Sequence, residues 1–132
     1  MSKGISGNQI LIPGLLAGED LSAKQWHCVR LASTANEVLD AYTTTHRTIG
    51  ILQNDPADGE PALVCALGIS RAIAGTSLIS TGEMLGANSS GVFDTSGGTA
   101  GADYFVGRAL EAAGATGDFI TIVVSPGGFF RA

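Results

Sequence analysis

The sequence predicts an all-β protein, a small single-domain β-barrel or sandwich with extended N- and C-terminal arms. The chain has 132 residues, about the length of one domain. Nineteen of them are glycine, which indicates many tight turns. Short runs of β-branched and aromatic residues alternate with these turns about every ten residues, as in small barrels and sandwiches.

Two apolar segments lie outside the regular pattern, one near each end of the chain. The N-terminal run Ile10–Ile12 is closed by Pro13 and Gly14, and a Pro-Gly-Gly follows the last predicted strand. Because these residues break strands and helices, we divide the chain into three parts. These are an N-terminal arm (residues 1–14), a β-barrel-like domain (15–125) and a C-terminal tail (126–132).

The first half of the domain contains three strand-like segments. Residues 26–31 and 49–52 are rich in β-branched, apolar or aromatic side chains, and the second run ends at Asn54-Asp55-Pro56, a strong turn signal. Residues 61–73 predict one long strand, or two strands broken near Gly68. Their second part alternates apolar and polar side chains, which is typical of a half-buried strand.

Shorter elements follow in the second half. The sequence predicts short strands at 78–79 and 84–85, a turn at 88–91, a strand at 92–93 and a Gly-rich loop at 95–101.

The last third of the chain contains an ambiguity between helix and strand. Residues 107–113 have good helix propensity, whereas residues 119–124 are the clearest strand of the protein. A hairpin between 104–112 and 119–124, turning at 115–118, competes with the helix. We favour the hairpin, because the rest of the chain has strand patterns.

Composition and charge exclude several functions. The net charge is −5, from 7 basic and 12 acidic residues, and no basic cluster occurs, so neither nucleic acid nor a membrane surface is an expected partner. No apolar run approaches the ~20 residues of a membrane helix, and the start shows no secretory signal. We therefore expect a soluble chain made in the cytosol.

Signatures of catalysis and cofactor binding are missing. The sequence contains no phosphate loop, no dinucleotide-binding glycine pattern and no nucleophile elbow of a serine hydrolase. His27, Cys28, His46 and Cys65 form a possible metal set, but they lack the short paired spacing of zinc sites. We expect no cofactor, no metal and no enzymatic activity; an enzyme using His27, Cys28 or Cys65 is the least favoured hypothesis.

The two arms supply the candidate interface. Apolar side chains on free segments expose a patch that often marks a contact with another molecule. Such side chains either fold back on their own domain or dock on a neighbouring subunit. The candidate residues for an interface with another subunit or protein are Ile10, Leu11, Ile12, Phe129 and Phe130.

Four stretches between Ala17 and Val124 form a recognisable pattern of turns and strands: AGEDLSAKQWHCVRL, IGILQNDPADGEPALVCALGISRAIAG, SLISTGEMLGANSSGVFDT and VGRALEAAGATGDFITIVV. Their most specific pieces are IGILQNDP with its following glycine, and GRALEA before the final strand. On these stretches, most of the chain resembles the capsid cement (head-decoration) proteins of tailed bacteriophages, and the candidate interface would then be one with a capsid.

The resemblance implies a small β-barrel-like protein on the outer capsid surface of the virion, assembled in the host cytoplasm. It implies binding to the major capsid protein, stabilisation of the expanded shell, self-association as a dimer or trimer, and no catalysis. It also supports the hairpin over the helix. The alternative is a small β-rich ligand- or glycan-binding module displayed on the particle, in which Trp26, Tyr42 and Tyr104 would stack on sugars.

Overall fold

The protein is built from β-strands. The structure, a computed structural model, describes residues 8–76, 79–94 and 101–131, and within these ranges it contains ten strands and no helix. The predicted all-β, single-domain fold is confirmed. No helix long and apolar enough to cross a membrane occurs in these ranges. The strands are β1 Gln9–Leu11, β2 Leu16–Ala17, β3 Cys28–Leu31, β4 Glu37–Asp40, β5 Thr48–Leu52, β6 Val64–Ile73, β7 Met84–Asn88, β8 Gly91–Asp94, β9 Gly101–Ala109 and β10 Phe119–Arg131.

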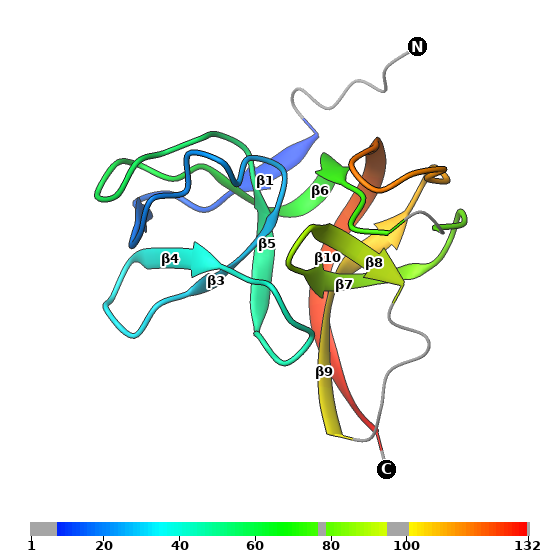
Figure 1. The fold of residues 1–132 in the computed structure, drawn as a ribbon. Helices are drawn as coiled ribbons and strands as arrows, with labels where there is room; N and C mark the ends of the chain where they lie inside the picture. Colours follow the sequence, from blue (N-terminus) through cyan, green and yellow to red (C-terminus); the bar gives the residue numbers. More distant parts are fainter. Residues whose placement is uncertain (1–7, 77–78, 95–100, 132) are drawn as a thin grey trace.

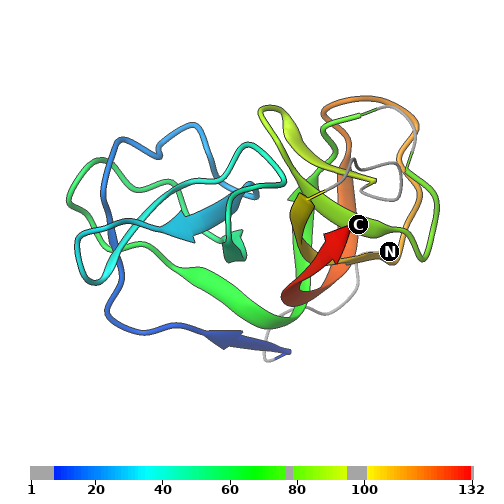
Figure 2. The same ribbon diagram turned by 90° about the horizontal axis from the view of Figure 1, so that it is seen from below.

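All ten strands belong to one mixed sheet that is not closed into a barrel. The order is β2-β4-β3-β5-β6-β10-β9-β7-β8, with β1 paired to β6 off this path. The pair β2–β4 is parallel, and the other strand pairs are antiparallel. The sheet curls into two lobes that lie side by side (Figures 1 and 2), which differs from both the barrel and the two-sheet sandwich expected from the sequence.

Strand β6 joins the two lobes. Its first residues pair with β5 and its last residues pair with β10. Cys65 lies opposite both Ile51 of β5 and Leu11 of β1, so β1 occupies the other edge of β6. Figure 2 shows β6 in green crossing from the lobe of β3 to the lobe of β10.

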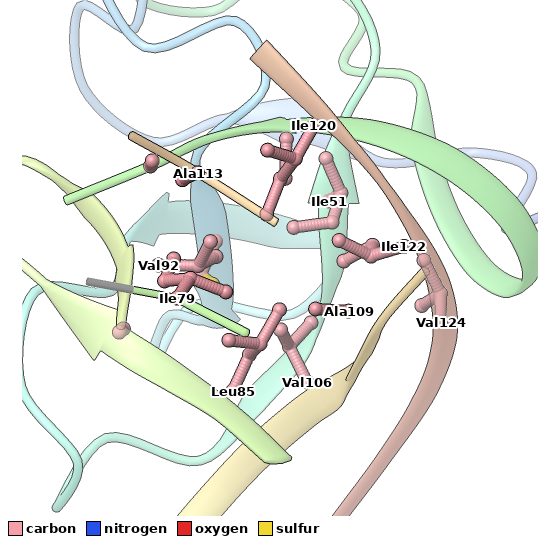
Figure 3. Packing of buried hydrophobic residues seen from close by; sticks show 14 of the residues in the cluster. Ile51, Ile79, Leu85, Val92, Val106, Ala109, Ala113, Ile120, Ile122 and Val124 are labelled. Atoms are coloured by element: carbon pink, nitrogen blue, oxygen red, sulfur yellow. The ribbon is translucent and has the colours of Figure 1, made fainter. Parts of the chain in front are cut away.

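Two hydrophobic clusters fill the lobes. The larger one gathers buried side chains mainly from β5 to β10, among them Ile51, Leu85, Val106, Ile120 and Ile122 (Figure 3). The smaller one lies in the other lobe and contains Leu15, Ala17, Leu21, Val29, Val38, Leu52, Ala62 and Val64. Because β5 and β6 send side chains into both clusters, the sheet connects the two cores into one domain.

The predicted break near Gly68 is a bend within one continuous strand. Gly68 has φ +117°, a conformation that L side chains rarely adopt. A Cβ at this position would collide with the carbonyl oxygen of Asn8, the residue that precedes β1. The glycine therefore lets the N-terminal segment cross β6 at close range.

The predicted hairpin at the end of the chain is confirmed, and the helix over 107–113 is not formed. Strands β9 and β10 pair antiparallel, with Ala109 opposite Ile122 and Gly107 opposite Val124. In the connection, the Asp118 carboxylate accepts hydrogen bonds from the N–H groups of Gly114 (3.1 Å) and Ala115 (3.0 Å). Strand pairing outweighs the helix propensity of 107–113 because β9 completes the larger core.

The C-terminal segment differs from the expected free tail. Strand β10 does not end at Val124 but continues to Arg131, and Gly127–Arg131 pair with the first half of β9. The register shifts between Val124 and Gly127, so Pro126 lies in a bulge, where its missing N–H costs no ladder hydrogen bond. The N-terminal segment also joins the sheet, since Gln9–Leu11 form β1.

The remaining strands agree with the sequence to different degrees. The segments around 26–31, 49–52, 84–85 and 92–93 all contain strands. Of the predicted strand at 78–79, Ile79 forms an isolated bridge with Ala113, while Leu78 lies outside the described residues. The expected loop at 95–101 lies outside them too, except Gly101, which begins β9. Strands β2 and β4 were not predicted.

Candidate functional site

The predicted apolar run near the N-terminus forms β1 at an edge of the sheet. Ile10 lies directly opposite Leu67 of β6, so the two side chains share one face. Both are largely exposed, Ile10 at 60% and Leu67 at 49%, and Leu11 is exposed at 42%. We call Ile10, Leu11 and Leu67 the β1 edge. It is an apolar surface made by side chains of β1 and β6, and β1 pairs on one side only in the described part of the chain.

A side-chain network fixes β1 in place. The Gln9 amide donates hydrogen bonds to the Gln53 side chain (3.1 Å) and to the Ile69 carbonyl (2.9 Å). Gln53 in turn donates to the Ser70 hydroxyl (2.9 Å) and to the Ile51 carbonyl (3.0 Å). Because Gln9 lies opposite Gly68, no side chain on β6 blocks its path to these partners. The β1 edge is therefore a positioned element rather than a free arm.

Ile12, the third residue of the predicted run, has a different environment. Its N–H donates to the Val64 carbonyl (3.1 Å), and its side chain is partly buried against the smaller core. The predicted triplet is thus divided, with Ile10 and Leu11 on the surface and Ile12 anchoring the chain to the lobe.

The two candidate phenylalanines lie in the second half of β10. Phe129 pairs with Asp103 and Phe130 with Ala102, both in β9. Figure 1 shows this end of the β9–β10 hairpin at the bottom of the molecule and β1 near the top. The structure therefore does not gather the five predicted interface residues into one patch.

Leu67 is an exposed neighbour of Ile10 that sequence reasoning did not single out. It lies in the segment 61–73, which was predicted as one long strand or two strands broken near Gly68. Its exposure depends on the position of β1, which covers the backbone edge of β6 but leaves the Leu67 side chain open beside Ile10. The exposure of Leu67 follows only from the register of β1 against β6, two segments that lie more than fifty residues apart in the sequence.

The possible metal set does not form. Among residues 8–76, 79–94 and 101–131, no group of three or more His, Cys, Asp or Glu side chains is placed to hold a metal ion. Cys28 and Cys65 are both buried free thiols, and burial raises the pKa of each. A thiol with a raised pKa stays protonated at neutral pH and is a poor nucleophile.

The two histidines are uncharged bases with separate environments. His27 is buried, and burial, followed by the charge of Lys24, lowers its pKa. Burial and the Arg30 guanidinium lower the pKa of His46, whose Nδ1 accepts a hydrogen bond from the Tyr42 N–H (3.2 Å). Asp40 opposes both shifts, and its carboxylate lies 3.5 Å from the Lys24 amine.

The aromatic side chains considered for sugar stacking are mostly engaged within the protein. Trp26 packs against the larger core and lies under the Arg71 guanidinium, 5.5 Å from its ring centroid. Tyr42 is exposed, and its ring meets the edge of His46 at 4.6 Å. Tyr104 is half-buried, and its N–H donates to the Thr44 carbonyl. Trp26 therefore presents one ring face to an arginine rather than to a ligand.

No protein-family model matches the sequence, and no curated protein matches it significantly. The resemblance to capsid cement proteins described above therefore remains a hypothesis about this chain.

Proposed function

We propose that this protein is a non-catalytic structural protein of a virion. It binds the outer face of the major capsid protein shell and stabilises the expanded capsid. The observation that carries the proposal is the β1 edge, where Ile10 of β1 and Leu67 of β6 form an exposed apolar pair across the two strands, and Gln9 holds β1 in place. The resemblance of residues 17–124 to capsid cement proteins supplies the partner.

The β1 edge has the chemistry of a protein-binding surface. A strand paired on one side presents backbone N–H and C=O groups on its other side, which can extend the sheet into a partner chain. Apolar side chains beside that edge add the burial that such a contact needs. The surface is small, so each copy binds weakly, and the many repeated sites of a shell supply the total strength.

The net charge of the protein favours a position on the outer face of the shell over one in its interior. The net charge of −5 repels packaged nucleic acid, whose phosphates attract basic proteins. The protonated buried thiols and the separated histidines support a role without catalysis. Self-association as a dimer or trimer is part of the proposal and is measured by analytical ultracentrifugation.

The test is co-sedimentation of the purified protein with expanded shells that lack decoration. The proposal predicts saturable binding of the wild-type chain, with many copies per particle. The double variant Ile10→Ser/Leu67→Ser removes both apolar side chains without touching either core, and binding falls by about tenfold or more, since each loses burial of about 1 kcal/mol or more.

The control is Leu110→Ser, which changes another exposed leucine in the connection after β9 and leaves binding unchanged. Point variants are sharper here than deletion of residues 126–132, because that deletion would remove half of β10 from the sheet. A folded wild-type protein that does not bind the shells overturns the proposal. A glycan array then becomes the test of the ligand-binding alternative.

A further inference from the structure

A second surface feature lies away from β1, where the end of β3 meets the connection between β4 and β5. It is an open groove of about 450 Å³. Its lining comes from two stretches of the chain, Arg30, Leu31 and Ala32 at the end of β3, and Thr45, His46, Arg47 and Ile49 in the connection and the start of β5. The size is within the range of ~300–1,000 Å³ that is usual for small-ligand sites.

The groove concentrates positive charge on an acidic protein. It holds two of the seven Lys and Arg residues of a chain whose net charge is −5. Arg30 uses its Nε–H to hold the Asp40 carbonyl (3.1 Å), and in the described part of the chain neither it nor Arg47 forms an ion pair with a carboxylate. Arg47 is exposed, so the groove offers guanidinium donors that the protein itself does not neutralise.

His46 contributes a third donor. Its Nδ1 accepts the Tyr42 N–H, so in the neutral ring the proton is on Nε2. The Tyr42 ring, 4.6 Å away at an interplanar angle of 81°, holds the imidazole in this orientation. Burial and the Arg30 guanidinium lower the pKa of His46, and the Asp40 carboxylate opposes them, so a carboxylate bound in the groove would add to the effect of Asp40 on the ring.

The rest of the groove is apolar. Leu31 is 54% exposed, and Ile49 and Ala32 are half-buried beside it. A mixture of guanidinium groups and aliphatic side chains fits an acidic side chain with an aliphatic neighbour better than it fits a bare inorganic anion. A long polyanion is disfavoured, because beyond the groove it meets the acidic surface of the molecule.

We propose that the groove between Arg30–Ala32 and Thr45–Ile49 binds a carboxylate-bearing peptide segment in which Asp or Glu is flanked by aliphatic residues. One carboxylate lies between the Arg30 and Arg47 guanidinium groups, where two charged hydrogen bonds fix its orientation. The aliphatic neighbours contact Leu31 and Ile49. The inference is independent of the capsid proposal, because it uses a different surface and different residues.

The experiment is an NMR titration of the full-length, 15N-labelled protein with the peptide Ac-Leu-Glu-Leu-Asp-Leu-NH2. Its uncharged counterpart Ac-Leu-Gln-Leu-Asn-Leu-NH2 and inorganic phosphate are titrated in parallel. The acidic peptide shifts the backbone signals of residues 30–32 and 45–49, and the pKa of His46 rises in the complex because the carboxylate stabilises its protonated form. The uncharged peptide binds with an affinity at least about tenfold lower, because a charged hydrogen bond contributes about 1.5–3 kcal/mol.

The variant Arg47→Gln weakens binding of the acidic peptide by about tenfold or more, since it removes charged hydrogen bonds to the peptide. Arg47 is exposed, and within the described residues its side chain forms no hydrogen bond or ion pair. Arg108→Gln is the matched control. It removes an exposed arginine that binds the Gly82 carbonyl elsewhere and leaves peptide affinity unchanged. Equal binding of both peptides, binding of phosphate in preference to the peptide, or full affinity in Arg47→Gln would each overturn the proposal.

Discussion

Gly107 shows how one missing side chain permits a close strand pairing. A Cβ at this position would collide with the carbonyl oxygen of Val123 in the neighbouring strand β10. Gly114, in the turn that follows β9, is different, because a Cβ there would meet only the Asp118 carboxylate at 3.9 Å. The two glycines therefore form a matched pair for mutagenesis.

We predict that Gly107→Ala lowers the free energy of unfolding by about 1–3 kcal/mol, because β9 and β10 must separate to admit the methyl group. Gly114→Ala changes it by less than about 0.5 kcal/mol, as expected for an exposed site with room. Urea denaturation of both variants measures the difference. Equal stabilities would show that β9 and β10 are not packed this closely.

The histidines predict the pH dependence of stability. Burial lowers the pKa of His27 and of His46 below the value of 6.5 that applies to the unfolded chain. As pH falls, the unfolded state takes up protons first, so the stabilisation present above pH 6.5 is lost as pH falls through 6.5 toward the folded pKa values.

We therefore expect the free energy of unfolding to decrease from pH 7.5 to pH 5.5 in the wild type. The double variant His27→Gln/His46→Gln shows a much flatter profile over the same interval, whatever its absolute stability. Urea denaturation at several pH values makes the measurement. An unchanged slope in the double variant would assign the effect to other groups.

Some of the residue-scale features were accessible from the sequence. Ile10 and Leu11 were singled out from an apolar run beside Pro13, but the sequence left open whether their side chains fold back on the domain or stay exposed. The burial of Ile12 and the exposure of Leu67 were not predicted, because both depend on the register of β1 against β6, which local patterns do not encode.

At the scale of elements, strong local sequence patterns were sufficient to predict a strand, and weak ones were not. The apolar run 119–124 and its turn predicted the β9–β10 hairpin. Strand β4 has only four residues, without a clear alternation, and β2 has two, so neither carries a signal above that of a loop. The Pro-Gly-Gly after Ser125 suggested the end of a strand, but a bulge accommodates it and β10 continues.

The attachment of β1 gives a prediction at this scale. Gln9→Ala removes the side-chain hydrogen bonds to Gln53 and Ile69, each contributing about 0.5–1.5 kcal/mol. We expect β1 to open locally, so that the Ile69 N–H, which donates to the Asn8 carbonyl, exchanges with solvent faster.

Exchange of the Val106 amide, at the larger core, serves as the internal reference and stays unchanged. Hydrogen exchange followed by NMR resolves the two positions in one sample. Equal acceleration at both positions would mean that β1 is required for the whole fold rather than attached to it.

At the scale of the molecule, one sheet connects two cores. Leu85 is fully buried in the larger cluster and Leu21 in the smaller one, while β5 and β6 contribute to both. We expect the fold to unfold as one cooperative unit, because β6 pairs with strands of both lobes and, together with β5, contributes side chains to both cores.

We predict that Leu85→Ala and Leu21→Ala each lower the free energy of unfolding by about 2–5 kcal/mol and each preserve a single transition. Trp26 fluorescence reports on the packing at the larger core, and far-UV circular dichroism reports on the entire sheet. The two signals coincide in both variants. Separate transitions in Leu21→Ala would show that the lobes are independent folding units.

The central claim is that the molecule attaches to a capsid through the β1 edge. The most direct measurement is an electron cryomicroscopy reconstruction of expanded shells saturated with the wild-type protein. The account predicts density on the outer surface of the shell, with Ile10 and Leu67 buried against the major capsid protein. Density in which the β1 edge faces solvent, or shells that carry none of the protein, would contradict it.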